Sequence, residues 1–592
     1  MNRESRQRFA GLPCLSVCRY YNSLAVIRRS TVGPPSATTH PATRGLMQFC
    51  LRTFAVVAAL ALAIPSAAHA QSRTTSAIRG FVTAQDGSIL VGGTVVIRHD
   101  ETGASRSGLT NANGAFLVLL LQPGGPYSVS IQHLGYSEGR VEGIRLAVGE
   151  TFTMEYVMQE QAVELQGIDV AVERATIFTP TQIGPATRLT ERVLDATPIM
   201  SRDVMELAVL SPLVKTTEGG GFSVAGQNDR YNAILVDGLA SKDMFGLTSG
   251  GVPGGQAGAK LIPIDAVAQY EVLVAPFDVR LSGFTGGVMN AVTRSGTNDW
   301  RVRIGGVHRA EQLMGDLQLP TGPVAASGVD RSLLSFSVGG PVVLDKGHFF
   351  VAAEFERRNQ PPSGYNLFRD PESLVRISGE SMDEFASLMQ TDHGVDVGNA
   401  AAYPLSQQLS NVFVRSDWNF DNGTRLTLRN VFSHATNDES PNRSAFLPYE
   451  LSSNTVQRTS MNNITSLQLF SPLGDRFSNE FDMTVQISSD ESAPTTDWPQ
   501  VEVDVRSSIG DVSLNRPVRV GGQFFAQDNG LDQTSIRATN SLDIRSEGDD
   551  VVTLGITGSY YDIAHRFLPG AAGEYYFPSM ADLRANAPER YQ

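Results

Sequence analysis

The residue patterns in this sequence that come nearest to catalytic motifs are all incomplete. Gly221-Phe-Ser223-Val-Ala-Gly226 misses the Gly-x-Ser-x-Gly spacing of a hydrolase nucleophile by one residue. Gly254-Gly-Gln-Ala-Gly258-Ala-Lys260 has an extra residue before the lysine and no Ser or Thr after it, so it is not a phosphate-binding loop. Loop flexibility is the better explanation of its glycines. We therefore predict that the protein is not an enzyme.

The side chains that usually hold metal ions are also poorly arranged for that role. The nine histidines are scattered, and none lies in a His-Glu-x-x-His motif. Asn111-Ala-Asn113-Gly114 could indicate calcium, but no twelve-residue ligand loop follows, and a β-turn is the better interpretation. We expect neither a metal site nor a bound cofactor.

The first 70 residues have the composition of a leader. Met47 begins a short basic segment, the apolar run Phe54–Ile64 follows, and Ala68-His-Ala70 is a small-residue cleavage signal. The apolar run is far shorter than the roughly 20 residues of a membrane-spanning helix. We predict a signal peptide cleaved after Ala70, with translation starting at Met47. A long leader from Met1 is the alternative.

Charge and cysteine content restrict the partners of the remaining chain. Eight of the 47 basic residues but only one of the 61 acidic residues lie in positions 1–70, so residues 71–592 carry a net charge of −21. This excess of acid argues against nucleic acid as a partner. Cys14, Cys18 and Cys50 all lie in the leader, so the rest relies on no disulfide and no thiolate metal site.

Residues 76–160 show short apolar strands separated by turns such as Asp86-Gly87. This spacing predicts a small antiparallel β-sandwich. Ile78-Arg-Gly-Phe-Val82, Asn113-Gly-Ala-Phe116, Tyr127 and His133-Leu-Gly-Tyr136 resemble the carboxypeptidase regulatory-like domain. The resemblance implies a transthyretin-like, carbohydrate-binding-like fold that is not itself catalytic.

Residues 188–298 have a mixed α/β pattern. Ser201 can cap a helix that has Val204, Leu207 and Ala208 on one face. Three segments read as strands: Ala233–Val236, Gln269–Val274 and Val288–Thr293.

Two motifs in this region resemble the plug domain of TonB-dependent outer-membrane receptors. The first runs from Gly226-Gln-Asn through Asn232-Ala-Ile-Leu-Val-Asp-Gly238, where Asp-Gly suits the corner of a hairpin. The second runs from Ile264-Asp265 to Gly286-Gly-Val-Met-Asn-Ala-Val-Thr293, with Met289 where the family usually has Ile. The combination of a regulatory-like sandwich with a plug is most similar to the Oar-like subgroup.

The linker, residues 161–187, contains one β-prone segment with no pairing partner nearby in the sequence. It consists of Ile168, Asp169, Val170, Ala171 and Val172. The receptor family carries its Ton box in such a position, so the resemblance implies that this segment binds the inner-membrane TonB complex. An unpaired strand offers N–H and C=O groups that a partner strand can complete. A linker strand that pairs internally is the alternative.

Residues 299–592 alternate between apolar and polar positions in segment after segment. Phe481, Met483, Val485 and Ile487, for example, alternate with polar residues, which fits lipid outside and water inside. Short turns such as Asp345-Lys-Gly347 alternate with long polar loops, of which the longest spans roughly Asn359 to Gln408. Tight turns at one end and long loops at the other are typical of an outer-membrane barrel.

We therefore predict a mainly β protein: a signal peptide, a small transthyretin-like sandwich, a mixed α/β plug, and the first part of a large transmembrane antiparallel β-barrel. We expect about ten strands after Trp300. A lumen that holds a plug needs roughly 22 strands. The chain is therefore expected to be a fragment of a longer one.

The resemblance implies a receptor or transporter in the outer membrane of a Gram-negative bacterium, with the sandwich in the periplasm. An unknown external ligand would be taken up by energy-coupled opening of the plug, and the partners would be TonB and the lipid outer membrane. Candidate ligand-facing residues in plug loops are Arg230, Tyr231, Asp243 and Phe245, together with the Tyr403 region of the longest barrel loop. Solvated loop residues are the alternative for each. The alternative for the whole protein is an adhesion or glycan-binding surface protein without transport.

Overall fold

The structure is a computed structural model in which part of the chain is described. The predicted leader, the cleavage site at Ala70 and the predicted Ton box lie outside the described residues. The described residues are 75–160, 186–217, 221–246, 250–276, 278–315, 317–319, 322–324, 328–362, 377–400, 403–442, 448–474, 476–509, 512–546 and 551–592.

The sandwich consists of two sheets that enclose one apolar core. Strand order is β4-β1-β7 in the first sheet and β3-β2-β5-β6 in the second. Buried core residues such as Ile78, Val95 and Ile131 come from both sheets. One pairing differs from the expected antiparallel pattern, because β1 and β7 are parallel. The strands are β1 (Ser76–Ala84), β2 (Thr94–His99), β3 (Ser105–Leu109), β4 (Ala115–Leu121), β5 (Gly124–Gln132), β6 (Gly139–Leu146) and β7 (Thr151–Met158).

The Asn111 region forms a turn between β3 and β4. The Asn111 side-chain oxygen accepts hydrogen bonds from the backbone N–H groups of Asn113 (2.9 Å) and Ala115 (3.0 Å). An Asn side chain that bonds the backbone two residues on mimics a turn. The turn interpretation is confirmed.

The plug is built on a five-stranded sheet of order β12-β11-β14-β13-β8. The two sequence motifs meet in it, because β11 and β14 pair in parallel, with Ala233 opposite Val288 and Val236 opposite Ala291. The main plug elements are β8 (Ala186–Leu189), α2 (Glu191–Ala196), β9 (Val214–Thr216), β10 (Phe222–Val224), β11 (Ala233–Val236), β12 (Leu239–Ala240), β13 (Val267–Val274) and β14 (Gly287–Thr293).

The helix expected after Ser201 is a 3₁₀ helix, Val204–Leu210, and Asp203 caps it. The Asp203 side chain accepts a hydrogen bond from the Met205 N–H (2.9 Å), whereas the Ser201 hydroxyl bonds the Asp203 N–H (3.2 Å). The expected cap was therefore wrong by two residues. Val204, Leu207 and Ala208 are buried, as their spacing predicts.

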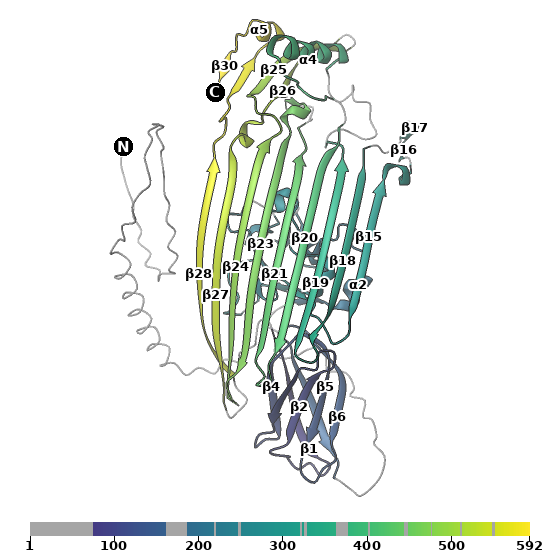
Figure 1. The fold of residues 1–592 in the computed structure, drawn as a ribbon, viewed down its shortest axis with the longest axis vertical. Coiled ribbons are helices and arrows are strands. Elements are labelled where there is room, and N and C mark those ends of the chain that lie inside the picture. The colour runs from purple at the N-terminus through teal and green to yellow at the C-terminus, as the bar shows by residue number, and fades with distance from the viewer. Residues whose placement is uncertain are drawn as a thin grey trace, which may run out of the picture. The chain divides into compact units, whose positions relative to one another are not determined.

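A nine-stranded antiparallel sheet forms most of the remaining structure (Figure 1). Each strand pairs with the next along the sheet, in the order β15-β18-β19-β20-β21-β23-β24-β27-β28. Within the described residues this sheet has nine strands where about ten were expected. Its strands are β15 (Arg301–Ala310), β18 (Asp330–Val343), β19 (Gly347–Gln360), β20 (Leu405–Asn419), β21 (Arg425–Glu439), β23 (Val456–Pro472), β24 (Phe477–Pro494), β27 (Asn529–Arg545) and β28 (Val551–Phe567). A short hairpin of β16 (Leu317–Leu319) and β17 (Gly322–Val324) follows β15.

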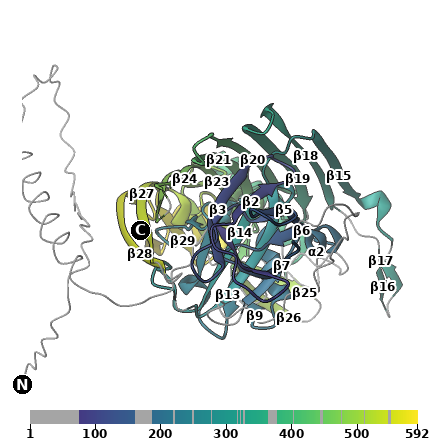
Figure 2. The ribbon, with the colours of Figure 1, turned by 90° about the horizontal axis from the view of Figure 1, so that it is seen from below.

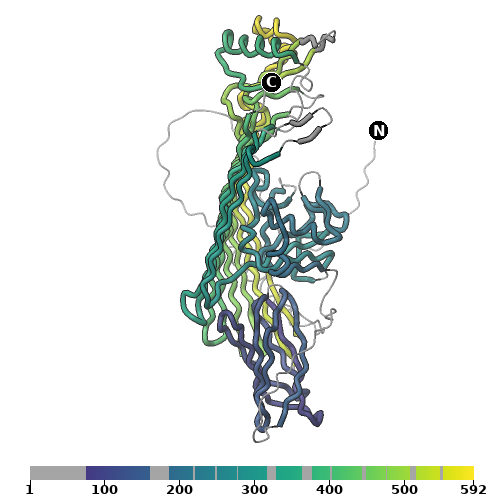
Figure 3. The backbone as a smooth tube through the Cα atoms, turned by 90° about the vertical axis from the view of Figure 1, so that its right-hand side faces the viewer, coloured from purple at the N-terminus to yellow at the C-terminus, as the bar shows by residue number. Residues whose placement is uncertain are grey.

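Burial across this sheet is the reverse of that in a water-soluble sheet. In β24 the polar side chains are buried, among them Asp482, Thr484 and Gln486, while the intervening Ile487 is 50 % exposed. The plug lies against one face of the sheet (Figure 3), and this is the polar face, because Arg202 and Lys260 of the plug pair with Glu354 on it. An apolar outer face with a polar inner face is the pattern of a membrane barrel wall. The expected fold class is confirmed.

The long connections at one end of the sheet fold into a second, smaller sheet, which we call the cap. Its strands follow the order β22-β26-β25-β29-β30 and share a core with the two cap helices. The cap lies at the end of the long strands away from the short turns (Figure 1). Its elements are α4 (Gly379–His393), β22 (Tyr449–Glu450), β25 (Gln500–Ile509), β26 (Val512–Val520), β29 (Glu574–Phe577), α5 (Met580–Arg584) and β30 (Arg590–Tyr591).

Helix α4 corrects the expectation of one long polar loop between Asn359 and Gln408. Ser378 caps its N-terminus by accepting from the Ser381 N–H (3.2 Å), and Gly394, with φ of 71°, ends it. Met382, Phe385 and Met389 repeat at helical spacing and are buried. The polar composition of the segment hid this apolar stripe.

Among the described residues, no helix has the length and apolar character needed to cross a bilayer.

The exposed apolar face gives a first prediction. Ile556 in β28 is 55 % exposed on the apolar face, and Thr557 points to the opposite face. Ile556→Arg should destabilise the protein folded in phospholipid vesicles by about 2–4 kcal/mol, because a charge on the lipid face is costly near the bilayer centre. Urea titration in vesicles measures the free energy of unfolding. Thr557→Arg is the matched control, with an expected cost below about 1 kcal/mol; equal costs for the two variants would show that this face does not meet lipid.

Candidate functional site

The contact between the plug and the polar face of the nine-stranded sheet is the candidate functional site. The strands form an arc with β13 and β14 on its inner side (Figure 2). One apolar core spans the contact, since Phe350, Phe413 and Ile464 from the strands cluster with plug residues such as Val236 and Leu261. Around this core the contact is polar and charged.

Lys260 is the centre of the largest ion network in the contact. Its ammonium group lies 2.8 Å from a carboxylate oxygen of Glu354 and 2.8 Å from one of Glu356, both on β19. It also donates to the carbonyl of Ser201 (2.9 Å). The Glu354 side chain is only 1 % exposed. A carboxylate so buried depends on paired charges to remain ionised.

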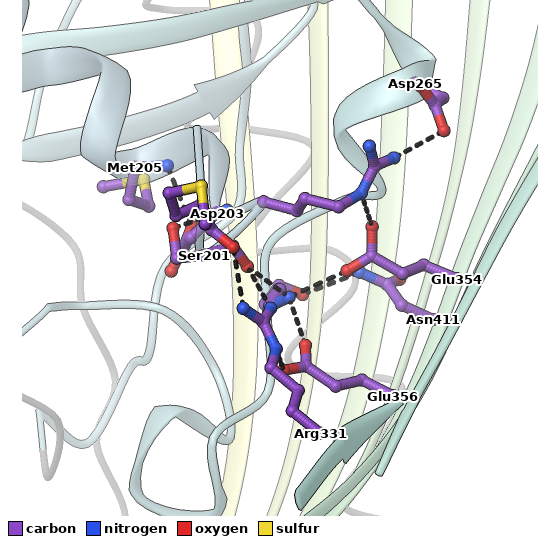
Figure 4. Close-up of polar contacts among 11 residues, drawn as sticks. Ser201, Asp203, Met205, Asp265, Arg331, Glu354, Glu356 and Asn411 are labelled. Atoms are coloured by element: carbon purple, nitrogen blue, oxygen red, sulfur yellow. Dashed lines mark hydrogen bonds and ion pairs between the residues drawn. The ribbon is translucent and has the colours of Figure 1, made fainter. Parts of the chain in front are cut away.

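Two arginines complete this network, and Figure 4 shows one of them, Arg331, beside Glu356. Arg202 of the plug donates to Glu354 (3.0 Å) and to Asp265 (2.6 Å). Arg331 of β18 donates to Glu356 (2.6 Å) and to the carbonyl of Met200 (2.7 Å). Three cations thus meet three carboxylates. We call the six residues the plug latch: Arg202, Lys260 and Asp265 from the plug, and Arg331, Glu354 and Glu356 from the strands.

The backbone around the latch is held in an unusual conformation. Arg202 has φ of 56°, which is uncommon for a residue with a side chain. Nearby, burial raises the pKa of the Asp203 carboxyl above its ordinary value, although the Met205 N–H bonds it. The positive φ of Arg202 is a strained conformation, which persists only where surrounding contacts fix the chain. The ion pairs of the latch supply those contacts.

Gly254 and Gly258 let the loop before Lys260 approach the strands closely. A Cβ on Gly254 would lie 2.1 Å from the Ser460 hydroxyl, and one on Gly258 would lie 2.0 Å from the Gln407 amide. Both glycines also have positive φ. Close packing, rather than the loop flexibility inferred from the sequence, explains why glycine stands at these positions.

A second buried cluster surrounds the Asp237-Gly238 hairpin corner between β11 and β12. Asp237 (φ 48°) and Gly238 (φ 76°) both have positive φ, as the motif predicts. The Asp237 carboxylate accepts from the Thr293 N–H (2.8 Å) and hydroxyl (2.6 Å) and pairs with Arg429 of β21. Burial opposes ionisation, but the nearby Arg429 and Arg415 outweigh it and hold the pKa of the carboxyl below its ordinary value.

Arg415 of β20 links this corner to the wall of strands. Its guanidinium group donates to the Thr293 hydroxyl (2.8 Å) and carbonyl (3.0 Å), and it forms a two-point contact with Asp417 (2.7 and 2.9 Å). Bidentate arginine–carboxylate pairs fix geometry as well as charge. The end of β14, the last strand of the second plug motif, is therefore bonded directly to the strands.

The predicted ligand-facing residues occupy different environments. Arg230 and Tyr231 are exposed, and the carbonyl of Arg230 accepts from Lys242 (2.7 Å). Asp243 is buried, whereas the half-exposed Phe245 packs its ring 4.8 Å from His565 and donates its N–H to Gln533 (3.1 Å). The Tyr403 hydroxyl bonds that of Thr455 (2.6 Å). Asp243 and Phe245 meet, because the Phe245 N–H also donates to the Asp243 carboxylate (3.1 Å), which accepts from Gln533 (3.4 Å). The ligand-facing role of all five residues stays a prediction.

Sequence reasoning missed the latch. Lys260 was considered only as part of a failed phosphate-loop motif, and Glu354 and Glu356 were not singled out. Their signal was present, because two carboxylates two residues apart lie on the same face of a strand. Within the described residues, no group of three or more His, Cys, Asp or Glu side chains is arranged to hold a metal ion.

TonB-dependent outer-membrane receptors have this arrangement: a mixed α/β plug packs on the polar face of strands whose opposite face is apolar. Comparison with known proteins agrees with this class. The chain is 25 % identical over 315 residues to the TonB-dependent transporter Oar of Myxococcus xanthus, covering 51 % of this chain and 28 % of that protein. Residues 77–159 match the carboxypeptidase regulatory-like domain family. The expected resemblance to Oar-like receptors with such a domain is confirmed.

Several solved structures are also similar. The outer membrane transporter YddB from Escherichia coli matches with 11 % identity and a TM-score of 0.47, over 68 % of this chain and 52 % of its own. The siderophore receptor PirA from Acinetobacter baumannii matches with 14 % identity and a TM-score of 0.41, over 65 % and 49 %. The chain thus spans about half the length of these structures and under a third of Oar.

The latch gives a second prediction. Lys260→Met removes the cation shared by the buried Glu354 and the part-buried Glu356 and leaves each carboxylate with one arginine. Breaking a buried pair from one side costs about 3–5 kcal/mol, so urea denaturation should show a loss of that size in the free energy of unfolding. Hydrogen exchange at the β13 and β14 amides should quicken.

The plug lysine Lys242 supplies the matched control, because it bonds a backbone carbonyl and forms no ion pair shorter than 4 Å among the described residues. Lys242→Met should cost under about 1.5 kcal/mol. Adding Glu354→Gln and Glu356→Gln to Lys260→Met should recover part of the loss. Equal losses of unfolding free energy for the two lysine variants would contradict the role of the latch in holding the plug.

Proposed function

We propose that this chain is part of a TonB-dependent outer-membrane receptor that takes up an external ligand by energy-coupled movement of the plug. The single observation that carries the proposal is the plug latch, which joins a plug to the polar face of strands whose other face is apolar. The similarity to the TonB-dependent transporter Oar supports the same reading. Homologues of this kind are transporters or receptors and not enzymes.

The order of parts follows from this proposal. Residues 1–70 are the leader, 76–160 the regulatory-like sandwich, 161–187 the linker with the Ton box, 188–298 the plug and 299–592 the barrel strands. The short turns belong to the periplasmic side of the membrane and the cap to the outside. A contact supports the periplasmic position of the sandwich, since Arg106 of β3 donates to the carbonyl of Gly423 in a short turn (2.8 Å).

The latch gives a physical route for opening. The plug is held by a few ion pairs that are strong only while they remain dry and complete. A pull on the linker by TonB would first reach β8, which pairs with β13 from Leu189–Tyr270 to Ala186–Leu273. Displacement of this sheet admits water to the latch, and hydrated ion pairs contribute little. Arg230, Tyr231, Asp243, Phe245 and the Tyr403 region are proposed to face the ligand or its path.

The rival function is an adhesion or glycan-binding surface protein without transport. It accounts for the sandwich and the cap, but it gives no role to a plug bonded inside the strands. Dependence on TonB separates the two functions.

A third prediction concerns the linker. Deleting residues 168–172 should abolish uptake and leave surface binding of the ligand intact, because the strand that TonB pairs with is gone while the cap is unchanged. A synthetic peptide of residues 161–187 should bind the purified periplasmic domain of TonB, and the peptide without residues 168–172 should not. Uptake of labelled ligand by cells and fluorescence anisotropy of the peptides are the two measurements.

Deletion of residues 161–165, an equally short piece of the same linker, is the matched control and should preserve both uptake and peptide binding. Undiminished uptake without residues 168–172 would contradict the Ton-box assignment. Uptake that survives loss of TonB altogether would contradict the proposed function.

A further inference from the structure

An open groove of about 1030 Å³ lies where the cap meets the ends of β23 and β24. Its walls are the chain after α4 (residues 394–396 and 398), the turn at Ser452-Ser453, residues 494–498, Gln527 before β27 and Ala572 before β29. We call it the cap groove. It lies apart from the plug latch, since no latch residue lines it.

The groove is held in a fixed shape by bonds behind its surface. Trp498 lines it and packs against Gly521, where a Cβ would come within 2.4 Å of the indole ring. The Trp498 carbonyl accepts from the Gly522 N–H (2.9 Å), and the Gly521 N–H donates to the Ser453 hydroxyl (3.2 Å). The orientation of the Trp498 ring is therefore fixed, because its backbone is hydrogen-bonded to the cap and one edge of its ring packs against Gly521.

The charge of the groove excludes one large class of ligands. Among the described residues, its lining contains two carboxylates, Asp396 and Asp497, and no Lys, Arg or His. An anionic ligand would meet repulsion without any compensating cation. Carboxylate-rich metal chelates and phosphorylated compounds therefore do not fit.

The remaining hydrogen-bonding capacity of the lining is mainly that of an acceptor. The hydroxyls of Thr495 and Thr496 donate to backbone carbonyls, Thr495 to that of Thr455 (3.1 Å) or Ser453 (3.2 Å) and Thr496 to that of Ser453 (3.2 Å), so their oxygen lone pairs can still accept. Asp396 accepts only from Gly398 (2.8 Å), and Asp497 has no hydrogen bond or ion pair among the described residues. Such a lining suits a ligand that presents many hydroxyl groups.

We propose that the cap groove binds a neutral oligosaccharide, with Trp498 stacking on one sugar ring and Asp497, Thr495 and Thr496 accepting from its hydroxyls. Sugar hydroxyls can donate to the acceptors of this lining, and the apolar face of a pyranose ring matches an indole surface. The volume is at the upper end of the range for small-molecule sites, which favours a chain of several sugars over one. The proposal rests on the proposed function in one respect: the cap must face the external medium.

A cationic peptide is the competing ligand, because the groove is acidic. It fits less well, since the backbone carbonyls of a peptide would find few donors among these side chains. Of the two carboxylates, Asp396 already accepts from Gly398, so within the described residues only Asp497 is left to pair with a cation of the peptide.

The test uses the full chain purified in detergent and isothermal titration calorimetry. The probes are maltohexaose, cellohexaose, mannohexaose and xylohexaose, with hexalysine and hexagalacturonate as the charged probes. At least one neutral hexasaccharide should bind saturably, and both charged probes should not. Trp498→Ala should weaken that binding at least tenfold, which corresponds to about 1.4 kcal/mol, and Asp497→Lys should weaken it comparably.

Trp300→Ala is the matched control, because Trp300 lies at the start of β15 and outside the groove. It should leave the affinity within twofold of the unmodified protein. Near-ultraviolet circular dichroism reports whether the cap of each variant is folded. Asp497 is exposed, so Asp497→Lys decides the test if Trp498→Ala fails to fold.

Three results would overturn the proposal: no neutral hexasaccharide binds, hexalysine binds in preference, or Trp498→Ala and Asp497→Lys leave saccharide affinity unchanged. These failures are distinct from failure of the proposed function, since calorimetry on purified protein needs no TonB. Saccharide binding together with uptake that does not need TonB would support the groove proposal and contradict the proposed function. TonB-dependent uptake without saccharide binding would support the proposed function and contradict the groove proposal.

Discussion

Burial of a charged sheet face against the plug is the constraint on which the rest of this structure depends. Glu354, Asp417 and Arg429 point inward from strands whose other face is apolar, and water is excluded from them by the plug. Ions in such a position are tolerated only when every one is paired and hydrogen-bonded. The plug supplies Lys260, Arg202 and Asp237 at the required places. The charges on the plug and those on the inner face of the strands are therefore complementary, and neither set could stay buried without the other.

In the proposed function, the same constraint makes the contact both specific and reversible. Apolar packing at Phe350 and Phe413 stabilises the contact between plug and strands, and because it is non-directional it changes little when the plug shifts slightly. The ion pairs add a sharp dependence on position, because their strength falls once water enters. On this proposal, the plug is stable at rest and is loosened by a local displacement of a few bonds. That property is what a pulled plug requires.

The cap contributes a different kind of organisation. Three connections at one end of the sheet and the chain after β28 share one apolar core, in which α4 and α5 pack on β25. Loops tied together in this way form a fixed surface, and the groove at their base is neutral to acidic. The proposed ligand groove and the plug latch thus lie at separate places, with different chemistry.

Local patterns in the sequence were enough to predict much of this protein. Period-two alternation in β24 and the turn residues between strands determined a barrel wall, and positive-φ residues at Asp237-Gly238 determined a hairpin, because both depend on neighbours in the chain. The latch, by contrast, joins Lys260 to Glu354 and Glu356 across about 95 residues, and no spacing rule reaches so far. The same is true of the cap, whose core collects residues from Ile377 to Leu583. The sequence alone thus determined which faces are polar and where the chain turns. Only the tertiary structure decided which opposite charges meet, because pairing across a sheet and a plug is set by packing in space and not by order along the chain.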